Sequence, residues 1–144
     1  MPACVWLALG FIVLLTVVTV VGRFSMRRIA AARAGESFET FRDAFAMEPV
    51  PADVLRGVYA KFQECASGFG GTGFPVRADD VIDHVYGMVD EDLDDALEEV
   101  ISECGRRIPP EEQLRRMEPV VTVRDFARFV AACPATADRV AGPR

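Results

Sequence analysis

The chain has few of the side chains that build metal sites and nucleophilic active sites. It holds a single histidine, His84, and its four cysteines (Cys4, Cys65, Cys104 and Cys133) show no Cys-x-x-Cys spacing. A zinc site needs several such ligands at short spacing, and a nucleophile needs a base to activate it. We therefore predict no metal site, no catalytic residue and no enzymatic activity. The cysteines are interpreted as reduced packing residues.

Charge is absent from the start of the chain, because no charged side chain precedes Arg23. At about 1.5 Å per residue, this apolar run can cross a hydrocarbon core of about 30 Å. Four arginines follow it before the first acid: Arg23, Arg27, Arg28 and Arg33. Basic residues stay on the cytoplasmic side, so we predict a transmembrane anchor over 1–24 with its N-terminus outside. A cleaved signal peptide is the alternative, disfavoured because no basic residue precedes the run.

The rest of the chain is short of positive charge. Residues 36–133 contain 21 acidic and 10 basic side chains, a net charge of −11. Such a balance disfavours nucleic acid and direct contact with anionic lipid, and favours a basic protein surface, so we predict no nucleic-acid partner. We expect lipid contact through the anchor and the four arginines only. The predicted location is a membrane, in bacteria the inner membrane, with the C-terminal domain cytoplasmic.

No period-two alternation of apolar residues persists after the anchor, which predicts an all-α fold. We divide the chain into the anchor, a juxtamembrane helical linker over 25–50, a four-helix domain over 51–133 and a disordered tail over 134–144. Phe38, Phe41 and Phe45 lie on one side of the linker helix. That side either packs on the domain or lies on the membrane, and the mixed charges favour packing.

Four helices are predicted inside the domain, over 53–66, 91–104, 111–117 and from 122 onward. Asp53 is a candidate cap of the first, Gly105 ends the second, and Thr122 with Asp125 forms a variant capping box on the last. The first is followed by a glycine-rich stretch, Gly68-x-Gly70-x-x-Gly73. This matches a dinucleotide-binding pattern in form, but a helix precedes it and Pro75 follows, so we interpret it as a flexible connection.

The most distinctive segment is the acidic helix over 91–104. Residues 79–103 carry eleven carboxylates and no lysine or arginine, while apolar residues recur at the spacing of one buried helix face. This predicts a helix with a core-facing side and a charged, solvated side. We predict that its charged side binds a partner through Asp90, Glu91, Asp92, Asp94, Asp95, Glu98 and Glu99.

The same run also resembles the opening of a calcium loop, as Asp90-x-Asp92-x-Asp94. A twelve-residue loop starting at Asp90 would need glycine at position six and glutamate at position twelve. The chain has Asp95 and Ile101 there. A calcium loop is therefore disfavoured, and loose association with divalent cations stays open as an alternative.

Over 53–133 the order of segments is similar to that of acyl carrier proteins: a long helix, a long loop, an acidic helix, a short helix and a final helix. GRRIPPEEQLRRMEPVVTVRDFARFV, at 105–130, resembles that family's pattern of an Ile-Pro after the acidic helix and a Thr-Val opening the last one. FPVRADDVIDHVYGM, at 74–88, resembles the loop that ends just before the carrier serine. The resemblance implies an acyl-carrier-like helical bundle.

The family's attachment serine is missing. In acyl carrier proteins a Gly-x-Asp-Ser-Leu stretch places a hydroxyl at the start of the acidic helix, where 4′-phosphopantetheine is attached. Here the stretch is Gly87-Met88-Val89-Asp90-Glu91, so Asp90 occupies the serine position. Asp94-Asp95-Ala96 is similar instead to uncharacterised bacterial carrier-like proteins without the serine. The resemblance then implies no cofactor.

These observations predict a membrane-anchored, acyl-carrier-like domain that acts as a non-catalytic protein-interaction module. Two alternatives stay open. The chain could be a functional phosphopantetheine-dependent carrier that uses another serine, Ser67 or Ser102 being the nearest. It could instead be a membrane-tethered regulator that responds to divalent cations.

Overall fold

A computed structural model of the chain describes residues 3–67 and 73–136. Over those residues the protein is mostly helical and has no strand, which confirms the predicted fold class. Two isolated antiparallel bridges, Val81 with Thr122 and Arg106 with Ala135, hold connections together. The glycine-rich connection at 68–72 and the tail at 137–144, for which we predicted flexibility and disorder, lie outside the described residues. The helices are α1 (Ala3–Ala32), α2 (Phe38–Asp43), α3 (Ala52–Ser67), α4 (Ile82–Tyr86), α5 (Asp90–Glu103), α6 (Glu111–Leu114) and α7 (Val123–Ala132).

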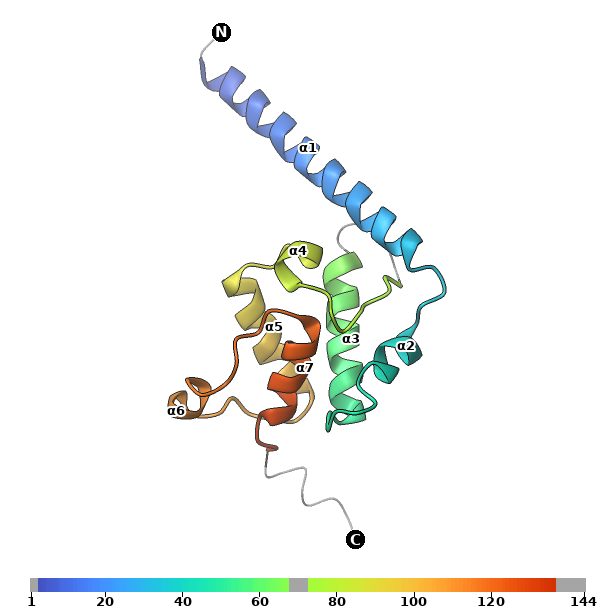
Figure 1. Cartoon of the computed structure of the whole chain (residues 1–144). Helices are drawn as coiled ribbons and strands as arrows, with labels where there is room; N and C mark the ends of the chain where they lie inside the picture. The colour runs from blue at the N-terminus through green and yellow to red at the C-terminus, as the bar shows by residue number, and fades with distance from the viewer. Residues whose placement is uncertain (1–2, 68–72, 137–144) are drawn as a thin grey trace.

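Helix α1 projects from the helical body, as Figure 1 shows. It is the one helix in the described part of the chain that is long and apolar enough to cross a membrane. Its described side chains up to Val21 are exposed, because nothing in the body covers them. The helix continues without interruption past the end of the apolar run to Ala32. That α1 crosses a membrane, and on which side the body then lies, stay predictions.

The body is built around α3, which contacts α2, α4, α5 and α7. Val54, Val58 and Phe62 recur on one face of α3 and are fully buried, as the helical period requires. The ring of Phe62 stands edge-on to Phe126 of α7 at 5.1 Å and tilted against Tyr86 of α4 at 4.8 Å. Burying aromatic rings in such pairs provides a large share of the packing energy of a small core.

The predicted linker over 25–50 contributes to the same core. Phe41 and Phe45 are buried with the side chains of α3, and the Phe41 ring lies 5.2 Å from Tyr59. Ser37 caps α2 by accepting a hydrogen bond from the Glu39 backbone nitrogen. The phenylalanines of this segment therefore pack on the body, as the mixed charges favoured, rather than on a membrane.

Most predicted helix ends are confirmed, and two are wrong in detail. The Thr122 hydroxyl accepts from the Asp125 backbone nitrogen at 3.2 Å, and the Asp125 carboxylate accepts from the Thr122 backbone nitrogen at 2.9 Å. Gly105 adopts the left-handed conformation expected after α5, with φ of 63°. Asp53 does not cap α3, because the helix already begins at Ala52. Helix α6 ends at Leu114, three residues earlier than predicted.

Candidate partner-binding surface

All seven predicted partner-binding carboxylates are exposed on α5. The opposite side of the helix supplies Ala96, Val100 and Ile101 to the core, and Leu93 and Leu97 are half-buried beside them. The helical period thus separates the charged side from the buried side, as the sequence predicted. The seven are Asp90, Glu91, Asp92, Asp94, Asp95, Glu98 and Glu99.

Little of this charge is neutralised within the described part of the chain. Glu99 forms an ion pair with Lys61 of α3, and the Glu99 hydrogen bond raises the pKa of the lysine. The Asp92 carboxylate accepts a long hydrogen bond, 3.4 Å, from the Val89 backbone nitrogen. Neither Asp92 nor the other five pair with a cation in the described structure; those five are Asp90, Glu91, Asp94, Asp95 and Glu98. The surface therefore keeps a net negative charge available for a basic partner.

Asp90 lies at the first position of α5, where the carrier serine of the resembled family would lie. Its side chain is exposed and bears no hydroxyl for a phosphodiester. Ser102 lies in the last turn of α5, and the Ser67 hydroxyl donates to the Glu64 carbonyl at the end of α3. Neither serine is at the start of a helix, where the positive end of the dipole favours a phosphate.

A groove of about 320 Å³ lies between α3 and α5 beside the acidic surface. Its lining includes Lys61, Cys65, Met88, Asp92 and Ala96. Burial raises the pKa of the Cys65 thiol, which keeps it protonated and unreactive near neutral pH. Cys65 thus behaves as a packing residue, as predicted.

A buried ion pair joins Arg33, the residue directly after α1, to the body, and the sequence did not indicate it. The Arg33 guanidinium donates to both carboxylate oxygens of Asp80, at 2.8 and 2.5 Å, and to the Pro75 carbonyl at 2.9 Å. The two side chains are only 10% and 4% exposed. The expectation that Arg33 contacts lipid head groups is therefore wrong, because its charge is held inside the body.

Two further donors complete the surroundings of the Asp80 carboxylate. The Tyr86 hydroxyl donates to it at 2.9 Å, and the Arg77 backbone nitrogen at 3.0 Å. Burial and the neighbouring carboxylate raise the pKa of Tyr86, so its hydroxyl stays protonated and donates. The spacing of Met26, Ile29, Ala30 and Arg33, with three of them apolar, is the sequence signal that could have revealed this docked face of α1.

A second, more exposed network joins the segment after α2 to α7. The Glu48 carboxylate pairs with Arg124 and accepts from the Arg128 Nε at 2.8 Å. Arg124 also donates to Asp79 at 2.9 Å and lies over the Phe45 ring. Burial acts to raise the pKa of Glu48, but the hydrogen bonds from Arg128 and Arg124 outweigh it and hold the pKa below its ordinary value of 4.5.

Glu48→Gln is expected to lower the free energy of unfolding by about 1 kcal/mol at neutral pH, because charge-assisted hydrogen bonds from two arginines are weakened. Because the pKa of this carboxylate is lower in the folded state, its ionisation stabilises the fold at pH values above its ordinary pKa. This stabilisation is lost as the pH falls through the folded-state pKa. The difference between native and variant protein should therefore shrink below pH 4.5. Urea unfolding in detergent across pH measures it, and a constant difference would contradict the assignment.

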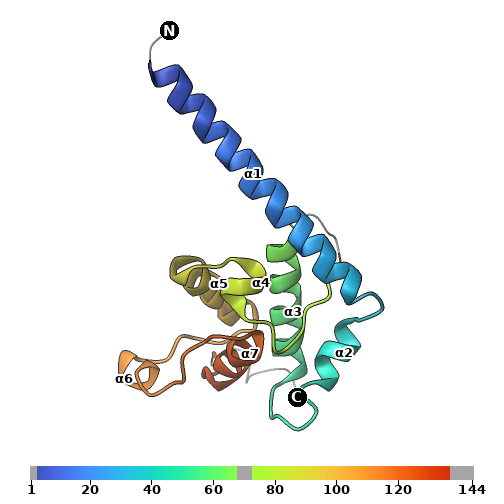
Figure 2. The same ribbon diagram turned by 45° about the horizontal axis from the view of Figure 1, so that its top comes forward.

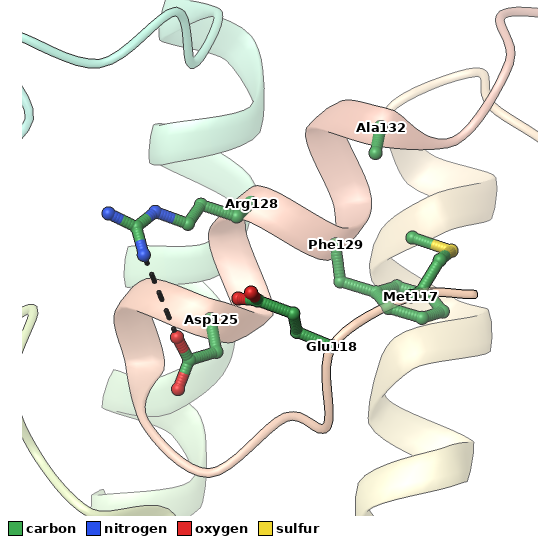
Figure 3. A pocket seen from close by; sticks show the side chains of 6 residues that line it. All are labelled: Met117, Glu118, Asp125, Arg128, Phe129 and Ala132. Carbon is green, nitrogen blue, oxygen red and sulfur yellow. Dashed lines mark ion pairs between the residues drawn. The ribbon is translucent and has the colours of Figure 1, made fainter. Parts of the chain in front are cut away.

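A small apolar groove of about 200 Å³ lies between the α6 segment and α7, on residues outside the predicted site. Figure 3 shows Met117 and Phe129 in it, with the Arg128–Asp125 ion pair at one side. The side chains of Leu114 and Met117 are half-buried, consistent with the inward orientation predicted for them. The groove marks where the α6 segment rests on α7.

The other residues singled out in the sequence do not join the acidic surface. His84 is exposed on α4, 3.7 Å from Asp83. The side chains of Cys104 and Cys133 are buried, which fits packing. Comparison of the chain with protein-family models, with curated proteins and with solved structures gives no match.

Proposed function

We propose that the chain is a membrane-anchored, acyl-carrier-like interaction module that binds a basic protein surface through α5 and carries no prosthetic group. The observation that carries this proposal is the pairing pattern on α5. Six of its seven exposed carboxylates pair with no cation among the described residues, and only Glu99 pairs with one. A surface of unneutralised charge speeds encounter with an oppositely charged partner, and its effect weakens as salt screens it.

Two further observations support the carrier-like part of the proposal. The described helices follow the predicted order of a long α3, a long connection, the acidic α5, a short α6 and a final α7. Asp90 begins α5, at the position that the resemblance assigns to the attachment serine. We further propose that α1 crosses the membrane and places the body in the cytoplasm, in bacteria at the inner membrane, because the arginines follow the apolar run.

Restoring the family motif tests the resemblance directly. The triple variant Val89→Asp, Asp90→Ser and Glu91→Leu places Asp-Ser-Leu after Gly87-Met88. Co-expression with a phosphopantetheinyl transferase should add the prosthetic group to this variant and leave the native chain unmodified. Intact-mass measurement of both proteins reports the outcome.

The control is the same triple variant with Asp90→Ala in place of Asp90→Ser, which lacks only the hydroxyl. An adduct on the native chain would contradict the non-carrier proposal and point to another serine. Absence of an adduct on the folded serine variant, with its helicity checked by circular dichroism, would remove the support for a carrier-like surface.

A further inference from the structure

We propose that the body lies against the membrane surface, with the C-terminal end of α3 at the lipid head groups. The inference rests on the proposed membrane crossing by α1. The docked face at the end of that helix consists of Met26, Ile29, Ala30 and Arg33. Gly22 is the last residue before Arg23, the first charged residue. Residues 3–22 span about 30 Å as a helix, which matches the hydrocarbon core.

Met26 follows Gly22 by four residues, or about 6 Å along the helix axis. It is only 6% exposed, whereas Phe24 is 64% exposed. An isolated helix would leave both side chains open, so the body covers Met26. The head-group layer is about 5–7 Å thick on each side of the hydrocarbon core. The body therefore reaches the depth of the head groups.

The contacts on α1 keep the body from moving away. Arg33 lies two helical turns beyond Met26, and its buried pair with Asp80 fixes the far end of the docked face. Ile29 and Ala30 pack against the core between these two residues. A body attached at both ends of this face cannot swing away from α1 without exposing apolar side chains and breaking a buried ion pair.

The end of α3 is the part of the body nearest to this region of α1. The Gln63 side chain donates to the Phe74 carbonyl at 3.2 Å, and the Arg33 guanidinium lies over the Phe74 ring. Figures 1 and 2 both show the C-terminal end of α3 beside α1, and α6 on the far side of the body. Arg27 and Arg28 of α1 are exposed, and a guanidinium suits lipid phosphate.

The single native tryptophan, Trp6, makes a clean test possible. In one full-length variant Trp6→Phe is combined with Ser67→Trp at the end of α3, and in a matched variant with Gln113→Trp on α6. Both new positions are exposed in the native chain, so neither should disturb the fold. Each protein is reconstituted in bilayers with and without lipids brominated near the head groups, because bromine quenches tryptophan at short range.

The expected result is a loss of fluorescence for the tryptophan at position 67 and none at position 113. Native protein in lipids brominated along the acyl chain should lose the fluorescence of Trp6, which reports insertion of α1 separately. Quenching of Trp6 without quenching at position 67 would overturn the inference and leave the membrane anchor standing. An unquenched Trp6 would overturn the membrane anchor and, with it, the inference.

Discussion

Asp80→Asn should lower the free energy of unfolding of the body by about 3–5 kcal/mol, because it leaves a buried guanidinium without its counter-ion. Arg33 is 10% exposed and directs both of its terminal nitrogens at Asp80. Asparagine has nearly the same shape as aspartate but cannot balance that charge. Urea unfolding of the full chain in detergent, followed by near-ultraviolet circular dichroism, measures the change without the helical signal of α1.

The neighbouring residue provides a matched control. Asp79 is 81% exposed and pairs with Arg124 at the surface, so Asp79→Asn should cost at most about 1 kcal/mol. The double variant Arg33→Met with Asp80→Leu should lose less stability than Asp80→Asn, because it removes both buried charges together. Equal losses for Asp79→Asn and Asp80→Asn would mean that the buried pair does not hold the body.

Neutralising α5 should slow association with its partner by about tenfold or more at low salt, since charge steering acts mainly on the encounter rate. The variant Asp94→Asn, Asp95→Asn and Glu98→Gln removes three carboxylates that have no cation partner in the described structure. The partner is first captured at low ionic strength, and association is then measured by biolayer interferometry over a series of salt concentrations. The dissociation rate should change little.

A second triple variant has the same net charge. Glu111→Gln, Glu112→Gln and Glu118→Gln remove three exposed carboxylates from the α6 segment, away from α5. Association of this variant should stay close to that of the native chain. If both variants slow association equally, the effect comes from total charge and α5 is not the binding surface. If association does not depend on salt, electrostatic steering is not the mechanism.

Local patterns in the sequence predicted the features that depend on a few neighbouring residues. The Thr122–Asp125 capping box, the left-handed Gly105 and the two sides of α5 follow from residue types three or four positions apart. The acidic side was predictable because burial and charge repeat with the helical period. Whether that side binds a partner stays a prediction, because the helical period determines which side chains share a face but not what they bind.

The attachment of the body to α1 could not be predicted in the same way. Arg33 and Asp80 are separated by 47 residues, and each looks ordinary in its own segment. An arginine after a membrane helix suggests lipid contact, and an aspartate in an acidic run suggests a solvated charge. Only the folded structure brings these two side chains into contact and buries them away from water. The same holds for Phe41, whose burial depends on α3 rather than on its own short helix.

The continuity of α1 from its apolar run to the docked face has a geometric consequence for the membrane plane. An α-helix turns about 100° per residue, so the continuous helix between Gly22 and Met26 fixes the direction in which the body faces relative to the faces of the apolar run. No hinge lies between them to average that direction. If α1 crosses a membrane as proposed, a protein that contacts one face of the apolar run would meet α5 at one fixed bearing, and inserting a single residue between Gly22 and Met26 would rotate α5 relative to that face by about 100°.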